Sequence, residues 1–282
     1  MAFGDILLAD VSERGKLRFA GEQRAWFLHQ IVTNRFEDIE VGDARAAAML
    51  TVHGRMVGFF DAVATDDALL AHMEPELLPG FTDALRRYVF ATQVEIEDVT
   101  NDFGLVVLVG DGWRDLAGKI EASIPHETQF IGPPAGHIWV PRGNIQAVIE
   151  TAARAGARVV AEEEIEQIRI AHGRPRWGRD MNEKTIPQEA RLEEFGALDF
   201  NKGCYVGQEA VAKIYFRGKV NRKVRRLSAA APLSVGAEVT KDEEKIGTVT
   251  SAAGGEAIAV LKHTVEPGES VTAGGVDATV AG

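Results

Sequence analysis

Short apolar runs separated by glycine turns fill the end of this 282-residue chain, and they restrict its fold more than any other feature. After Arg226, turn-forming glycines recur at short intervals: Gly236, Gly247, Gly254, Gly255, Gly268, Gly274 and Gly275. Such regularly interrupted short strands are typical of a small β-barrel or sandwich. The sequence therefore predicts a β-barrel over residues 226–282, in a chain whose length suits two or three domains.

The residues before this barrel mix helix and strand signals without the regular alternation of a doubly wound sheet. Strands are expected within residues 5–20, 46–50, 56–64, 92–99, 104–109 and 137–140, and helices at 22–33, 75–88, 113–122, 144–155 and 161–172. The predicted fold class is α+β. Residues 173–209 then lose all periodicity but contain several large apolar side chains, which favours a functional segment over a disordered one.

Composition excludes several classes of protein. The net charge of −11 argues against a surface devoted as a whole to nucleic acid or membrane. A single cysteine, Cys204, rules out a disulfide scaffold, a Cys-x-x-Cys pair and a cysteine-rich zinc site. The seven histidines are scattered singly, so we predict no metal site. No signal-peptide pattern or long apolar run is present, and we expect a cytoplasmic protein without membrane contact.

The most specific local feature is the segment NKGCYVGQE at residues 201–209. Lys202 precedes the thiol closely, and a neighbouring ammonium favours the thiolate form of Cys204. Gly203 and Gly207 permit close approach of the backbone to a ligand. A lone cysteine is also typical of a small buried apolar side chain, and no histidine base lies within 30 residues of it.

Two further segments carry charge. From residue 210 to 237 there is no acidic residue but seven basic ones, which leaves −18 for the rest of the chain. This stretch can bind an anionic ligand or RNA. The alternative is a solvated pair of strands whose lysines and arginines protect a sheet edge from pairing with another chain. In RIAHGRPRWGRDM, residues 169–181, Arg169 suits a planar anionic partner and Trp177 an aromatic one. The alternative is a helix that ends at Gly173 with arginines on its last turn.

The stretch KGCYVGQE, with Arg217 and Gly218 after it, resembles the signature of the YgfZ family, which is related to the glycine-cleavage T-protein, an aminomethyltransferase. The segments FLHQIVTN at 27–34, RIAHGRPRWGRD at 169–180 and IPQEARL at 186–192 agree with it. The resemblance implies a three-domain ring around a central folate-binding channel. Its expected parts are a discontinuous α+β folate-binding domain (1–100 and 165–225), a small α+β domain (101–164) and the C-terminal β-barrel (226–282).

The resemblance also implies a function. YgfZ-like proteins are accessory factors in the assembly or repair of iron–sulfur proteins, and they affect tRNA modification indirectly. The implied cofactor is tetrahydrofolate or a derivative, and the implied partners are iron–sulfur client proteins, with nucleic acid a less favoured one. The resemblance points to Cys204 as a reactive thiol with Lys202 beside it. Candidate folate contacts are Arg169, Trp177, Tyr205, Gln208, Glu209 and Arg217.

The chain departs from the T-protein pattern in MLTVHGRMVGFFDAV, residues 49–63. Where the T-protein pattern has two glycines and a pair of aspartates, Arg55 replaces the second glycine and only Asp61 follows, farther along. Because a general acid or base must reach the reacting nitrogen, we do not predict conventional enzymatic activity. The alternatives are an aminomethyltransferase or related folate-dependent enzyme, which would form methylene-tetrahydrofolate, and an RNA-binding module with steeply salt-dependent affinity.

Overall fold

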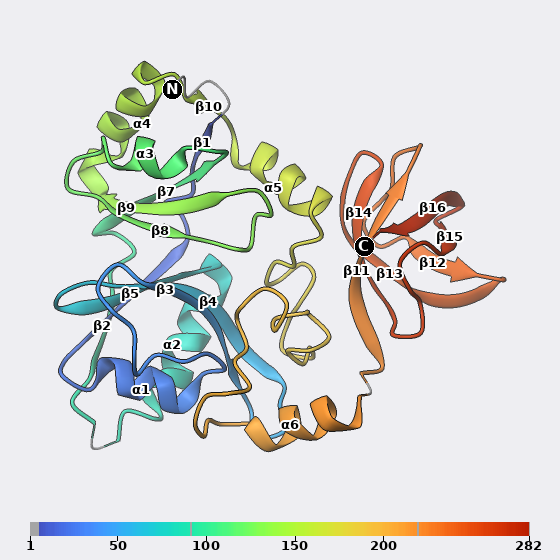
Figure 1. Ribbon diagram of the computed structural model, residues 1–282, viewed down its shortest axis with the longest axis horizontal. Coiled ribbons are helices and arrows are strands. Elements are labelled where there is room, and N and C mark those ends of the chain that lie inside the picture. Colours follow the sequence, from blue (N-terminus) through green and yellow to red (C-terminus); the bar gives the residue numbers. More distant parts are fainter. Residues whose placement is uncertain (1–5, 91, 219, 282) are drawn as a thin grey trace.

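The computed structural model describes residues 6–90, 92–218 and 220–281. Two stacked β-sheets with helices on their outer sides form one part of the molecule, and a β-barrel stands beside them (Figure 1). This is the α+β architecture with a C-terminal barrel that the sequence predicts. Among the described residues, no helix is long and apolar enough to cross a membrane.

The first sheet has its strands in the order β3-β4-β5-β2-β6, all antiparallel. These strands are β2 (Gly15–Ala20), β3 (Ala44–Leu50), β4 (Met56–Ala64), β5 (Ala68–Met73) and β6 (Glu95–Asp98). Helices α1 (Arg24–Ile31) and α2 (Leu78–Arg86), the latter preceded by the 3-10 turn η1 (Pro75–Leu77), pack on its outer face. Phe27 of α1 and Phe81 of α2 meet Phe60 of β4 in this layer of the core.

The second sheet has the order β10-β1-β7-β9-β8. Its strands are β1 (Leu7–Asp10), β7 (Phe103–Val109), β8 (Ile124–Glu127), β9 (Ala135–Pro141) and β10 (Arg158–Val159). Helices α3 (Trp113–Ala117) and α4 (Ile145–Arg154), with the 3-10 turn η2 (Arg142–Asn144) before α4, cover its outer face. Although β1 and β2 are close in sequence, they lie in different sheets, so the chain crosses between the sheets at Arg14.

The inner faces of the two sheets pack against each other. On β7, Val106 and Leu108 point to the helices, while Leu105, Val107 and Val109 point to the first sheet. Because both faces of this strand are buried, it is an uninterrupted apolar run. The layer between the sheets is apolar along most of its length.

The last part of the chain forms a closed barrel with strand order β11-β14-β13-β12-β15-β16. Its strands are β11 (Arg222–Ala229), β12 (Glu238–Lys241), β13 (Glu244–Ala253), β14 (Glu256–Lys262), β15 (Ser270–Ala273) and β16 (Val276–Ala281). Helix α5 (Glu162–Ala171) contacts strands β13 and β14, whereas α6 (Gln208–Arg217) lies at the bottom of the molecule, before the chain enters β11 (Figure 1). The predicted barrel is therefore confirmed.

Residues 172–207 contain no helix or strand and lie between the sheets and the barrel (Figure 1). Trp177, Leu192 and Leu198 bury their side chains in the core of the first sheet, which explains why so irregular a segment is ordered. The predicted domain boundaries stay a prediction. Strand β1, which falls within residues 1–100 of the predicted folate-binding domain, pairs with strands of the second sheet.

Some elements differ from the sequence expectations. The expected helix at 113–122 ends at Ala117, and strands β5 and β8 had no sequence prediction. The basic stretch after residue 210 was weighed as a strand pair, but its first part is helix α6. Tyr215 and Phe216 lie on this helix with exposed side chains.

Candidate functional site

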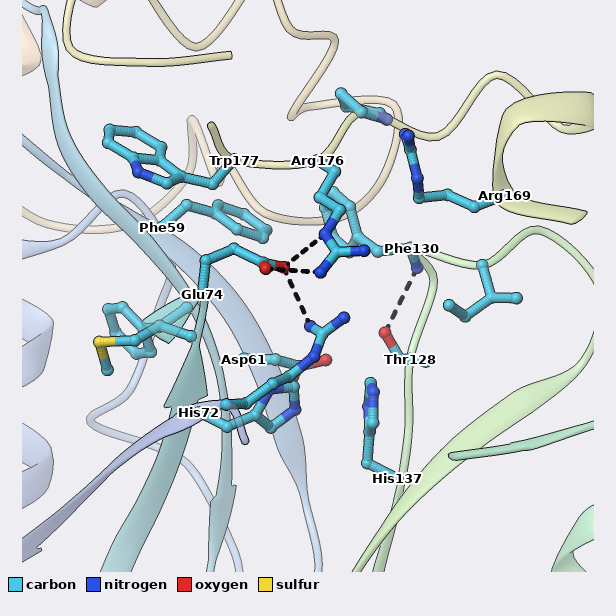
Figure 2. A pocket seen from close by; sticks show the side chains of 15 residues that line it. Phe59, Asp61, His72, Glu74, Thr128, Phe130, His137, Arg169, Arg176 and Trp177 are labelled. Carbon is cyan, nitrogen blue, oxygen red and sulfur yellow. Dashed lines mark hydrogen bonds and ion pairs between the residues drawn. The ribbon is translucent and has the colours of Figure 1, made fainter. Parts of the chain in front are cut away.

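A cavity opens between the first sheet, the second sheet and the irregular segment (Figure 2). Its volume is about 50 Å³, so it is narrow. We call it the central cavity. Residues far apart in the chain line it: Arg14, Phe59, Phe60, Asp61, His72, Met73, Glu74, Thr128, Phe130, Ile131, His137, Arg169, Pro175, Arg176 and Trp177.

Glu74 stands at the centre of the lining, between two arginines (Figure 2). Arg176 donates two hydrogen bonds to its carboxylate, from Nε at 2.9 Å and from Nη2 at 2.7 Å, and Arg14 Nη1 lies 3.3 Å away. Burial opposes ionisation of Glu74, but Arg14 and then Arg176 lower its pKa below the ordinary value. The cavity therefore holds a fixed carboxylate with compensating guanidinium groups.

Asp61 lies deeper in the cavity, beside His72 and His137 (Figure 2). Burial raises the pKa of Asp61 to about 7, although hydrogen bonding to Thr128 and the charge of Arg14 act in the opposite direction. Burial lowers the pKa of both histidines well below 6.5, so they are neutral. A carboxyl group that titrates near neutral pH can give or take a proton.

Aromatic rings form one wall of the cavity. Phe59 and Phe130 lie with their ring centroids 4.7 Å apart, and Trp177 lies near Phe59 (Figure 2). Planar rings beside a carboxylate and arginines can bind a flat heteroaromatic ligand, because stacking and hydrogen bonding then act together. Trp177 is thus a predicted folate contact that lies in the cavity.

Arg169 also lines the cavity, but its donors are already engaged. It forms an ion pair with Asp180 at 2.7 Å, binds Glu166 and donates to Ser251 Oγ at 3.0 Å. Ser251 lies on barrel strand β13, and its hydroxyl also donates to Asp180. Arg169 and Asp180 therefore fasten the barrel to α5 and the irregular segment.

The signature segment, residues 202–209, lies outside the central cavity lining. Lys202 turns its ammonium into the protein, where it donates hydrogen bonds to the backbone oxygens of His29 and Val32, both at 2.6 Å, and of Asn34, at 2.8 Å. His29 lies in the last turn of α1, whose last carbonyls have no partner within the helix, and Val32 and Asn34 follow the helix directly. Burial lowers the pKa of Lys202 to about 7.

The other signature residues surround this lysine. Tyr205 is buried in the core of the first sheet, whereas Cys204 is exposed. Gln208 and Glu209 begin α6, and a side chain at Gly207 would meet the backbone oxygen of Thr51, which explains the glycine. Of the candidate contacts, only Arg169 and Trp177 line the central cavity, while the side chain of Arg217 lies outside the described residues.

The basic stretch is largely paired within the protein. Arg222 binds Glu189 at 3.0 Å, Lys223 binds Glu194 at 2.9 Å, and Arg225 binds Glu266 at 2.9 Å. Arg226 donates to the backbone oxygen of Ala171 at the end of α5. Most of the charge on β11 therefore joins the barrel to its neighbours.

The fold is that of a T-protein. The crystal structure of the glycine cleavage system aminomethyltransferase T from Bartonella henselae matches with a TM-score of 0.86 and 17% sequence identity, over 98% of this chain and 85% of that one. Residues 221–281 match the CAF17 C-terminal beta-barrel domain. The predicted fold, with its C-terminal barrel, is confirmed.

The sequence relatives are consistent with the predicted resemblance to YgfZ proteins. A putative chloroplastic transferase of Arabidopsis thaliana is 26% identical over 277 residues, which are 89% of this chain and 62% of that protein. A tRNA-modifying protein YgfZ from Colwellia psychrerythraea is 22% identical, over 77% of this chain and 70% of its own length. A mitochondrial iron-sulfur cluster assembly factor IBA57 homolog from Mycosarcoma maydis is 25% identical, over 78% and 57%.

Proposed function

We propose that this protein binds a reduced folate in the central cavity and acts as an accessory factor in the assembly or repair of iron–sulfur proteins. The observation that carries the proposal is the lining of the cavity, where aromatic rings, carboxylates and arginines meet at the centre of a T-protein-like fold. The names of the YgfZ and IBA57 relatives support the role in iron–sulfur assembly and, through it, in tRNA modification.

The side chains that line the cavity can form the hydrogen bonds, stacking contacts and ion pairs that a folate needs. A pterin is flat and offers paired N–H donors, which suit the carboxylates of Asp61 and Glu74, while Trp177 and Phe59 provide rings for stacking. Arginines suit the carboxylates of the glutamate tail. Because the cavity is narrow, we propose that Arg176, whose side chain is 21% exposed, moves aside when the ligand enters.

We propose that Cys204 contacts the client protein and does not bind folate. Its exposure allows contact with a client protein, and one cysteine can supply only a shared or transient ligand because a cluster needs about four protein ligands. An exposed free thiol suits a reducing compartment, and we keep the cytoplasm as the proposed location. Two of the relatives are named as organelle proteins.

A second candidate function is folate-dependent aminomethyl transfer. It is favoured by Asp61, which is single in sequence but lies buried in the cavity with its pKa raised to about 7. Such a carboxyl group has the reach and the pKa of a general acid or base. Formation of methylene-tetrahydrofolate from an aminomethylated carrier protein, lost in Asp61→Asn, would favour this function over the accessory role.

The accessory role is tested in a strain that lacks the gene for this protein, by the activity of an iron–sulfur enzyme. Wild-type protein and the control Trp26→Ala, which changes an exposed tryptophan, are expected to restore that activity. Trp177→Ala is expected to restore little, because it removes a wall of the cavity. Full restoration by Trp177→Ala would contradict the proposal that the cavity carries the function.

A further inference from the structure

Four ionisable side chains meet in the apolar layer between the two sheets. On the first sheet, Asp61 of β4 lies directly opposite His72 of β5. On the second sheet, His126 of β8 lies directly opposite His137 of β9. The two cross-strand pairs face each other, and each of the four residues offers a ligand atom that lies within 4.8 Å of the other three.

The distances describe a compact group. The ring centroids of His72 and His137 are 4.3 Å apart, and His126 lies 5.4 Å from His137 and 5.6 Å from His72. His126 Nε2 is 3.9 Å from Asp61 Oδ1. We call these four residues the histidine cluster. Each of them is at least 94% buried.

The cluster interrupts an otherwise apolar surface. Its neighbours along the strands are Val63, Leu70, Ile124 and Trp139, which point into the same layer. A strand places alternate residues on one face, so the four ionisable residues occupy positions where the fold elsewhere has apolar side chains. Because burial of unpaired polar groups costs free energy, their placement needs a compensating interaction.

Most of the imidazole nitrogens have no such interaction within the protein. Both ring nitrogens of His72, both of His126 and Nδ1 of His137 have no hydrogen-bond partner in the part of the chain that the structure describes. Each unsatisfied buried group costs about 1–3 kcal/mol. A neutral imidazole has one nitrogen with a free lone pair and one N–H, so the three rings offer three lone pairs beside one carboxylate. This set of ligand atoms indicates that the histidine cluster holds a group that accepts lone pairs.

We propose that the histidine cluster binds a divalent first-row transition metal ion, for which Zn²⁺ is the probe. Neutral imidazoles and a carboxylate are the ligands that Zn²⁺ takes in four-coordinate sites. With metal–ligand bonds of about 2.0–2.1 Å, tetrahedral ligand atoms lie about 3.3 Å apart. The side chains therefore need to move inward by an ångström or so from their present separation.

The surroundings of the cluster bear on ligand entry and on charge. Thr128 lies beside Asp61 in the lining of both pockets, and a hydroxyl there can orient a ligating carboxylate. Access is available from two sides, because Asp61 and His137 line the central cavity while His126 lines a second, more open pocket together with Thr128. The cationic Arg14 lies near the cluster, and Glu74 and Glu162 at 3.3 and 3.5 Å balance its charge.

Metal titration of the full-length protein, stripped with a chelator and free of folate, tests the proposal. We expect one Zn²⁺ per chain, bound equally by wild type, by the exposed-histidine control His53→Gln and by Cys204→Ser. His126→Gln and Asp61→Asn are expected to weaken binding by more than about 100-fold, because losing a ligand exceeds the effect of losing an outer partner. Unchanged affinity in His126→Gln, or the absence of stoichiometric binding, would overturn the proposal.

A spectroscopic measurement serves if these variants do not fold. Co²⁺ in the wild-type site is expected to give the intense visible bands of tetrahedral coordination without a thiolate charge-transfer band. X-ray absorption at the zinc edge is expected to show three imidazoles. Weak octahedral Co²⁺ bands, or fewer than three imidazoles, would contradict the site.

Discussion

Replacing Lys202 by methionine tests what the most specific motif in this sequence does. The ammonium of Lys202 supplies hydrogen bonds to three carbonyl oxygens in the last turn of α1 and in the residues that follow it, and methionine fills similar volume without any donor. Each buried carbonyl left without a partner costs about 1–3 kcal/mol. We therefore expect Lys202→Met to lower the free energy of unfolding by about 3 kcal/mol or more.

The same variant is expected to change the pH dependence of stability. Since burial lowers the pKa of Lys202 to about 7 in the folded protein, from 10.5 in the unfolded one, the unfolded state binds the extra proton between these values. The free energy of unfolding of the wild type therefore rises with pH across this window, by at most about 1.4 kcal/mol per pH unit. Lys202→Met loses this contribution, so its deficit grows from pH 7 to pH 9.

Urea unfolding followed by tryptophan fluorescence at pH 7 and pH 9 measures both effects. The matched control is Lys213→Met, which makes the same change at an exposed lysine of α6 and is expected to leave stability unchanged within about 0.5 kcal/mol. A Lys202→Met protein within 1 kcal/mol of wild type would refute the structural role. The role of Lys202 would then be the chemical one predicted from the sequence, in which its ammonium favours the thiolate form of Cys204.

Three further predictions concern other parts of the molecule. Arg169→Met breaks the ion pair with Asp180 and the bond to Ser251, so we expect a loss of about 3–5 kcal/mol and faster hydrogen exchange in β13; unchanged exchange there would contradict the role of Arg169 in holding the barrel. Cys204→Ser is expected to keep the thermal stability of the wild type but to restore little iron–sulfur enzyme activity in the deletion strain, and full restoration would remove the thiol from the mechanism. Single-stranded RNA is expected to bind weakly at physiological salt, because β11 pairs its basic residues internally; tight and steeply salt-dependent binding in a filter assay would revive the RNA-binding hypothesis.

The sequence predicted the barrel well because its signals are local. Glycine turns such as Gly254 and Gly274 have positive φ, which glycine adopts readily, and each fixes a hairpin within a few residues. The irregular segment was also recognised, because Trp177 and Leu198 stand in it without any periodicity. The resemblance to YgfZ and T-protein sequences supplied the arrangement of the parts.

The sequence could not show what the motif residues touch. Lys202 and the segment FLHQIVTN were recognised separately, and only folding shows that the ammonium of one binds the carbonyls of the other. Arg169 and Asp180 were likewise recognised within one motif, but their partner Ser251 lies in the barrel. These motif residues form contacts between segments that are distant in the sequence. Such contacts leave no periodic pattern along the chain, so they cannot be predicted from it.

The histidine cluster was missed for the same reason. His72 and His126 lie on β5 and β8, two strands that are not predicted from the sequence, and more than fifty positions separate them. Their meeting depends on the packing of one sheet on the other, which no spacing rule describes. In the sequence, Asp61 stands out only as a departure from the T-protein pattern, although the structure places it both in the lining of the central cavity and in the histidine cluster.

Isothermal titration calorimetry of the purified protein with tetrahydrofolate tests the central claim most directly. We expect one binding site per chain, with affinity at least about tenfold weaker in Trp177→Ala, because stacking of one ring contributes about 0.5–1.5 kcal/mol in addition to its buried area. The exposed-tryptophan variant Trp26→Ala is expected to bind like the wild type. Absence of heat at millimolar tetrahydrofolate, or equal affinity in Trp177→Ala and the wild type, would contradict folate binding in the central cavity.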